Sequence, residues 1–143
     1  MSKPIIMDAL IEGYLSYLDK VGRKTPRTII DVRCTLRRAI EGLAQIPALK
    51  IYGITDPSCF DWRCPTLAVR VIDQTADQTP LVLATKLGDQ GFFTWDGNYY
   101  ALNLTEHLDV EKSGGFLRIG LVHYNTADEV DRLLAALKEI VGK

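Results

Sequence analysis

The clearest pattern of hydrophobic and polar positions lies in the last quarter of the chain. Apolar residues alternate at Leu117, Ile119 and Leu121, which predicts a strand over 116–122 with one face toward a core. Apolar residues then recur at helical spacing and predict an amphipathic helix over 126–141. The other face of the strand carries the residues between the alternating ones, namely Phe116, Arg118, Gly120 and Val122.

Helix starts are marked by capping residues. Thr126 and Glu129 form a T-x-x-E capping box, in which each side chain satisfies a backbone N–H at the helix start. Thr25 and Pro26 suit the N-cap and first position of another helix, which we expect to run over 26–44 and to end before Pro47.

The rest of the pattern completes an α+β fold. We expect a small mixed sheet of about four strands with helices packed on one face, preceded by an N-terminal helical hairpin. Thr79-Pro80 and Asn98 are the expected starts of two of the helices. The remaining elements are helices at 4–20, 79–89 and 99–109 and strands at 49–53, 66–73 and 91–95.

Arg118 is the unusual residue of the expected strand. Its guanidinium presents a fork of N–H donors that suits a planar carboxylate. The residue pattern alone leaves two readings open, a carboxylate clamp or a strand-end arginine paired with a structural Asp or Glu.

Composition narrows the class of protein. Hydrophobic residues make up 47% of the 143 positions and charged residues 24%, which is ordinary for a globular domain. No apolar run approaches the ~20 residues of a membrane span, and the N-terminus lacks a signal-peptide pattern. Three cysteines, an odd number, favour a reducing, cytoplasmic location. We expect no metal site, because the candidate ligands show no standard zinc spacing; they are Cys34, Cys59, Cys64, His107 and His123.

Several segments together resemble the C-terminal small domain of class V aminotransferases, the pyridoxal-phosphate enzymes that include the cysteine desulfurases. The resemblance covers residues of about 40–143. It implies a small domain, an amino-acid substrate class and a substrate-carboxylate arginine at Arg118, which tips the two readings toward the clamp. The matching stretches are those at 40–53, 63–69, 91–101 and 116–140.

Two departures from the family pattern limit the implied chemistry. Tyr100 stands where desulfurases carry a nucleophilic cysteine, so the resemblance does not support persulfide chemistry there. No lysine of the chain sits in the family's Schiff-base motif, so we expect no pyridoxal 5'-phosphate bound by this chain alone. The candidate active-site loop consists of Trp95, Asp96, Asn98 and Tyr100.

Charge is distributed unevenly along the chain. Residues 1–40 carry eight Lys or Arg against four Asp or Glu, whereas residues 41–143 carry nine against fourteen. The first forty residues also resemble, loosely, the core-binding domain of tyrosine recombinases. We therefore divide the chain into a hairpin at 1–38, a candidate fusion segment, and a small domain at 39–143. The basic excess is modest, which argues against a nucleic-acid partner.

Three functions follow as expectations. The first is a truncated or fused small domain that keeps the carboxylate-binding Arg118, is not catalytic alone, and meets a separate large domain or a second copy. The second is a non-catalytic binding or assembly module. The third is a DNA-associated protein acting through the N-terminal helices. The sequence leaves open whether the protein is an enzyme.

Overall fold

The structure, a computed structural model, describes residues 26–142. Its strands form one four-stranded sheet in the order β1-β2-β4-β3, and each neighbouring pair is antiparallel. The expected α+β class and four-stranded sheet are confirmed. Parallel pairing is limited to an isolated bridge between Gly97 and Gly115. The strands are β1 (Leu49–Tyr52), β2 (Thr66–Val71), β3 (Trp95–Gly97) and β4 (Phe116–Gly120).

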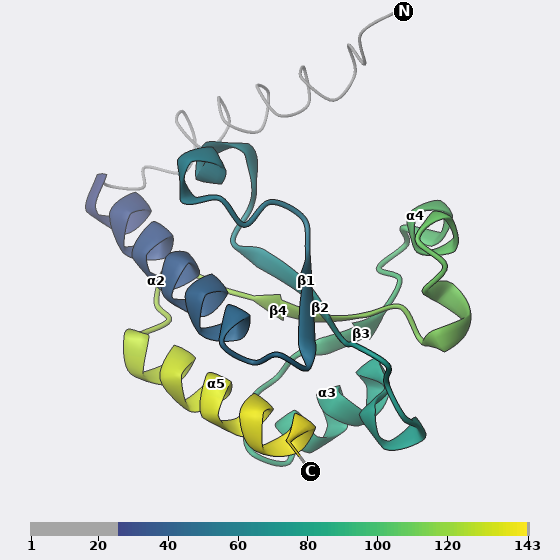
Figure 1. Ribbon diagram of the computed structural model, residues 1–143. Coiled ribbons are helices and arrows are strands. Elements are labelled where there is room, and N and C mark those ends of the chain that lie inside the picture. Colours follow the sequence, from purple (N-terminus) through teal and green to yellow (C-terminus); the bar gives the residue numbers. More distant parts are fainter. Residues whose placement is uncertain (1–25, 143) are drawn as a thin grey trace, which may run out of the picture.

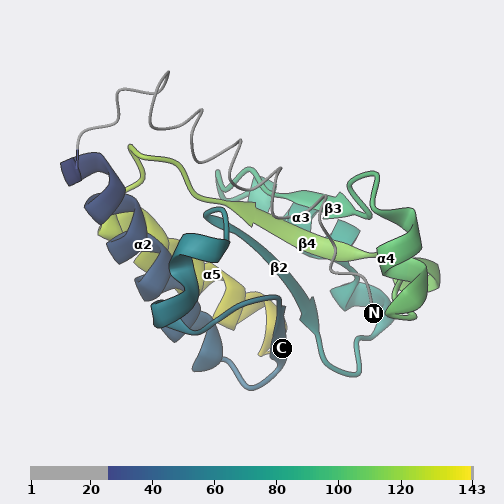
Figure 2. The ribbon, with the colours of Figure 1, turned by 90° about the horizontal axis from the view of Figure 1, so that it is seen from above.

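Three helices cover one face of this sheet. They are α2 (Pro26–Ala44), α3 (Pro80–Gly88) and α5 (Ala127–Val141), and α5 packs against both of the others (Figure 1). Seen from above, α2 and α5 run side by side on the same side of β2 and β4 (Figure 2). The short helix α4 (Leu102–His107) lies apart from this layer, next to the 3-10 turn η3 (Glu111–Ser113). The other 3-10 turns are η1 (Pro57–Trp62) and η2 (Ala76–Gln78).

The core lies between the sheet and the three helices. Leu67, Val69 and Leu117 point toward the helices and are 0% exposed, as the alternation along the strands requires. The helices contribute Leu83 and Leu137, which are equally buried. The predicted inward face of the 116–122 strand is confirmed. At roughly 25 cal/mol per Å² of apolar surface removed from water, this layer supplies the main stabilisation of the fold.

The predicted cap of the last helix is confirmed. The Thr126 hydroxyl accepts a hydrogen bond from the Glu129 backbone N–H at 3.2 Å, and the Thr126 N–H donates to the Glu129 carboxylate at 2.7 Å. Thr79 caps α3 in the expected way by accepting from the Val82 N–H at 3.4 Å.

Two expected elements differ in position. Asn98 does not cap a helix at 99–109; Ala101 is the N-cap of α4, because Tyr99 and Tyr100 have positive φ angles of 53° and 64° that a helix cannot contain. The strand expected at 91–95 is found at 95–97. The Phe92 N–H donates to the Leu87 carbonyl at 2.9 Å, so this segment still belongs to the turn that ends α3.

The N-terminal expectations fall partly outside the described residues. The helix predicted at 4–20 lies there, and so does most of the 1–38 segment. The proposed boundary at 38/39 falls inside α2, which is one continuous helix. Among residues 26–142, no helix is both long enough and apolar enough to cross a membrane.

Candidate functional site

Arg118 lies on the face of the sheet opposite the helix layer, here called the outer face. The antiparallel registers place Tyr52 opposite Ala68, Ala68 opposite Arg118, and Arg118 opposite Trp95. One row of side chains therefore crosses all four strands, with Arg118 in its centre and Trp95 at the edge strand. Trp95 is 71% exposed, so this end of the row is open to solvent.

The Arg118 guanidinium is exposed and carries no ion pair with any Asp or Glu among residues 26–142. Its Cζ atom lies 5.5 Å from the centre of the Tyr99 ring, a cation–π arrangement. The structural alternative for this residue, a strand-end arginine fixed by a carboxylate, is not found in the described part of the chain. The fork of donors is available to a ligand.

Tyr99 is a residue of this site that the sequence analysis missed. Its hydroxyl lies within hydrogen-bond reach of two backbone carbonyls, that of Phe116 and that of Trp95 at 2.8 Å. Burial raises the pKa of the Tyr99 phenol well above its usual range, and the negative charge of Asp96 adds to this effect. The sequence signal was weak, because a Tyr-Tyr pair after Gly97-Asn98 does not reveal which ring turns toward the arginine.

The four residues expected in the active-site loop do not converge. Trp95 shares the outer face with Arg118, whereas Asp96 pairs with Leu117 and so lies on the helix-facing side of β3. Asn98 is used internally: its amide donates to Glu111 at 3.0 Å and its oxygen accepts from the Tyr100 N–H at 3.1 Å. Tyr100 projects fully into solvent. The outer-face cluster thus consists of Arg118, Tyr99 and Trp95.

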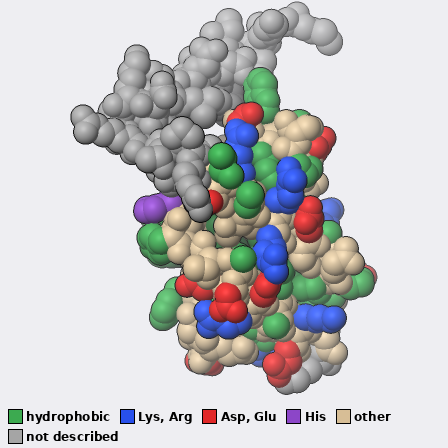
Figure 3. All heavy atoms as spheres, turned by 90° about the vertical axis from the view of Figure 1, so that its left-hand side faces the viewer, with side chains coloured by type: hydrophobic (Ala, Val, Ile, Leu, Met, Phe, Trp, Pro, Cys, Tyr) green, Lys and Arg blue, Asp and Glu red, His purple; other side chains and the backbone are tan. Residues whose placement is uncertain are grey.

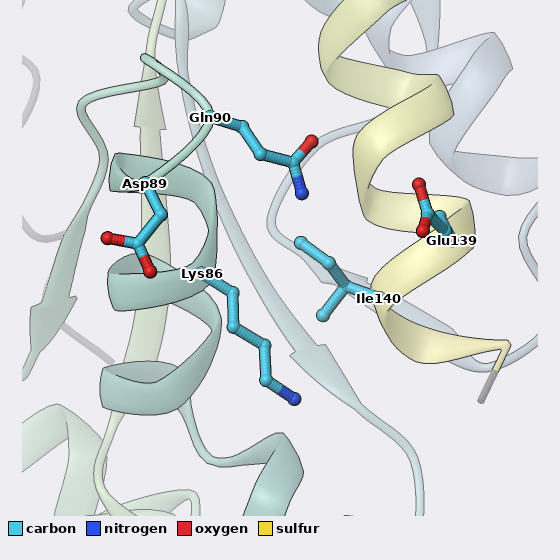
Figure 4. A pocket seen from close by; sticks show the side chains of 5 residues that line it. All are labelled: Lys86, Asp89, Gln90, Glu139 and Ile140. Carbon is cyan, nitrogen blue, oxygen red and sulfur yellow. The ribbon is translucent and has the colours of Figure 1, made fainter.

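A hollow of about 340 Å³ lies on the helix side of the molecule, between the end of α3 and α5 (Figure 4). Gln90 and Ile140 point toward one another across it, and Lys86, Asp89 and Glu139 complete its lining. Arg118 lies on the opposite face of the sheet, so we assign this hollow no part in the candidate site. Within the described residues no three His, Cys, Asp or Glu side chains gather in a metal-binding group.

Two of the arginines of α2, Arg33 and Arg38, are engaged in ion pairs. Arg38 binds Asp131 of α5 through two hydrogen bonds of 2.6 Å, and Arg33 pairs with Asp61. Figure 3 shows Lys and Arg interspersed with Asp and Glu on the side of the molecule that carries these helices. This mixture differs from the single-sign surface that nucleic-acid binding requires.

This chain is similar to an aminotransferase-like protein in sequence and to cysteine desulfurases in structure. An aminotransferase-like protein from Gibberella zeae is 29% identical over 104 residues, which cover 73% of this chain and 25% of that protein. A cysteine desulfurase from Thermococcus onnurineus superposes with a TM-score of 0.65 at 20% identity, covering 78% of this chain and 25% of that one. A cysteine desulfurase from Escherichia coli superposes with a TM-score of 0.65 at 23% identity, covering 90% of this chain and 28% of that one. No family model matches the chain.

These comparisons bear directly on the fold. The chain spans about a quarter of the length of the proteins it matches and shares the fold of that part of the cysteine desulfurases. The resemblance to aminotransferase-like proteins is supported, whereas none of these similarities points to a recombinase. The role of Arg118 and of the loop residues stays a prediction.

Proposed function

We propose that residues 40–143 act as the small domain of a class V aminotransferase or desulfurase-like protein, and that Arg118 binds the carboxylate of its amino-acid substrate. The observation that supports this most is the Arg118 guanidinium, which is exposed in the centre of the outer face and forms no ion pair with an acidic residue of the described part of the chain. A guanidinium can grip a planar carboxylate through two parallel hydrogen bonds.

The Tyr99 ring supports this role by restricting the guanidinium. Cation–π attraction, worth about 0.5–1 kcal/mol at an exposed site, favours conformations in which Arg118 stays over the ring. A side chain that is already confined loses less entropy when it binds a ligand. Trp95, directly opposite on β3, forms the open side by which a ligand would approach.

The residues described do not fit the covalent attachment of pyridoxal phosphate. Lys86 donates to the Asp77 carbonyl at 3.2 Å on the helix side, and Lys112 and Lys138 are exposed on η3 and α5. Lys50 lies with its ammonium 4.8 Å from the centre of the Tyr52 ring. We therefore derive no reaction step through the cofactor, and we propose that a lysine-bearing large domain outside the described residues, in this or another chain, supplies the chemistry.

The test of Arg118 compares the parent protein with Arg118→Lys, which keeps the charge but removes the fork. We expect the affinity for L-alanine to fall about tenfold, the effect of one charge-assisted hydrogen bond of about 1.4 kcal/mol. The Trp95 indole N–H signal in an NMR titration reports binding at this site. Equal affinities for the two proteins would defeat the proposal.

Two controls sharpen this experiment. Arg132→Lys alters an exposed arginine that pairs with Asp128 in α5, and it should leave the affinity unchanged. Alaninamide, which lacks the carboxylate, should bind equally weakly to the parent and to Arg118→Lys.

A second candidate is a binding module that holds a carboxylate without catalysis, and the outer-face cluster supports it equally because it contains no lysine. The two differ in one respect: a catalytic small domain must restore turnover when it is mixed with a lysine-bearing large domain, and a binding module must not. DNA association has less support, since Arg33 and Arg38 are paired with acids. Salt-dependent retardation of duplex DNA would revive it.

A further inference from the structure

A second group of cations lies on the outer face, one row away from Arg118. Lys50 of β1 is directly opposite Arg70 of β2 in the antiparallel ladder. Like charges in this position repel one another and destabilise a sheet, unless an anion compensates for them. Within residues 26–142 neither side chain forms a salt bridge with an Asp or Glu.

Arg70 is buried, with only 7% of its surface exposed. Its two terminal nitrogens are bonded to neutral oxygens, so its charge has no anionic partner in the described residues. Burial lowers the pKa of the guanidinium, the expected sign for a cation removed from water. The acceptors are the carbonyls of Gly115 and of Val110 (3.5 Å), the Gln74 side-chain oxygen (3.0 Å) and the Ser113 hydroxyl (2.9 Å).

These bonds fix the arginine firmly. Gln74 in turn donates to the Ser113 carbonyl at 2.8 Å, so the guanidinium, the amide and the turn at η3 form one connected group. These bonds engage both terminal nitrogens of Arg70. The Nε–H donor of the same guanidinium has no acceptor among the described residues. The positive charge is therefore held in place before any ligand arrives.

Lys50 and Arg70 line the same hollow, which has a volume of about 350 Å³. Tyr52, Val71, Ile72, Gln74 and Ser113 also line it. Asp73 also lines the hollow, so two cations face one carboxylate and the formal charge is +1. Arg118 is not among the lining residues, and Tyr52 packs edge-on against Phe116 at 4.8 Å between the two rows.

We propose that this hollow is a binding site for a small carboxylate, held by the Lys50 ammonium and the buried Arg70 guanidinium. A singly charged carboxylate neutralises the formal charge of +1, whereas a phosphate dianion would leave the hollow with a net charge of −1. The site is separate from Arg118 and does not depend on the function proposed for that residue.

A purely architectural role for Arg70 accounts for its bonds to Gln74 and to the residues in and beside η3, but it does not account for Lys50. Lys50 is exposed, and its ammonium has a cation–π contact with Tyr52. The Lys50 ammonium can therefore be removed by substitution without exposing the hydrophobic core. The experiment therefore changes Lys50 and leaves Arg70 in place.

The full chain is titrated with acetate while its amide and arginine side-chain NMR signals are recorded. We expect saturable shifts at Ser113, Gln74 and the Arg70 Nε–H. Lys50→Met should weaken acetate binding about tenfold, the loss of one charge-assisted contact. Lys138→Met, on the outer side of α5, is the matched control and should leave binding unchanged.

Each alternative outcome overturns the proposal. Absence of saturable shifts, or equal acetate affinity in Lys50→Met, would show that the hollow binds no carboxylate. Tighter binding of inorganic phosphate than of acetate would contradict the ligand class. Loss of the Ser113 shifts in Arg118→Lys would show that acetate binds at Arg118 instead. In that case the Trp95 indole signal of the parent would shift together with the Ser113 signal.

Discussion

The Arg118 guanidinium carbon lies 5.5 Å from the centre of the Tyr99 ring, while the Tyr99 hydroxyl reaches back to the Phe116 carbonyl two residues before that arginine. The loop after β3 is thereby attached to β4 beside the candidate ligand site. Both Tyr99 and Tyr100 adopt positive φ angles, which cost energy for bulky residues. The contacts of Tyr99 compensate for this cost.

We predict that Tyr99→Phe lowers the free energy of unfolding by about 1–3 kcal/mol, because the single phenol O–H that two backbone carbonyls share is lost. The affinity for L-alanine should change little, since the ring stays under Arg118. Tyr99→Leu should lower both the free energy of unfolding and the affinity for L-alanine. Urea unfolding and the NMR titration measure the two quantities, and Tyr100→Phe, at a fully exposed residue, is the control.

The same tyrosine predicts sensitivity to alkaline pH. The pKa of Tyr99 is raised in the folded state above its unfolded value of about 10. A raised pKa means that the neutral phenol stabilises the fold below pH ~10, and that this stabilisation is lost as pH rises toward the folded pKa. Stability measured between pH 8 and 11 should therefore fall less steeply in Tyr99→Phe than in the parent. Parallel curves would contradict the burial of this phenol.

Gly115 and Gly91 separate two effects of adding a methyl group. Both have positive φ angles, but a Cβ at Gly115 would lie 3.0 Å or less from backbone atoms of Gly97, whereas nothing lies within 4 Å at Gly91. We expect Gly91→Ala to cost about 1–2 kcal/mol from backbone strain alone. Gly115→Ala should cost about 1–3 kcal/mol more, because β3 must move away from β4. Equal losses of stability for Gly91→Ala and Gly115→Ala, measured by thermal or urea unfolding, would contradict this close approach of the backbone at Gly115 to that at Gly97.

The ion pair between Arg38 and Asp131 predicts a specific acid dependence. The hydrogen bonds and charge of Arg38 hold the pKa of the Asp131 carboxyl below its usual range. A depressed pKa contributes stability above the unfolded value of about 3.9, and this contribution is lost as pH falls through the folded pKa. The stability difference between the parent and Arg38→Gln should be present at pH 6 and disappear in acid. Since both side chains are about half exposed, added salt should also reduce it.

Pyridoxal phosphate tests the assignment of the cofactor to another domain. At equimolar concentration with the purified chain, we expect no absorbance band from a protein-bound Schiff base, because the described lysines lie apart from Arg118 in no common pocket. A stable band that borohydride reduction attaches to one lysine would contradict this expectation. Lysozyme or another unrelated protein of similar lysine content, treated in the same way, gives the absorbance that results from non-specific Schiff bases on surface lysines.

Local sequence signals were sufficient for much of the fold. The alternation at Leu117, Ile119 and Leu121 predicted the buried face of β4, and the spacing of Thr126 and Glu129 predicted the start of α5. These signals work because strand pleat, helix period and capping depend on residues only a few positions apart. The same locality explains the misplaced helix at 99–109, where two tyrosines of positive φ interrupt the pattern.

The sequence by itself thus determined the position of most of the described strands and helices, the buried face of β4, and that Arg118 stands on the opposite face of that strand. Only the tertiary structure decided that Tyr99 rather than Tyr100 lies beneath Arg118, that Asp96 turns to the other side, and that Lys50 faces a buried Arg70. The physical reason is strand register. It pairs residues far apart in the chain, and a shift by one position would send each of these side chains to the opposite face.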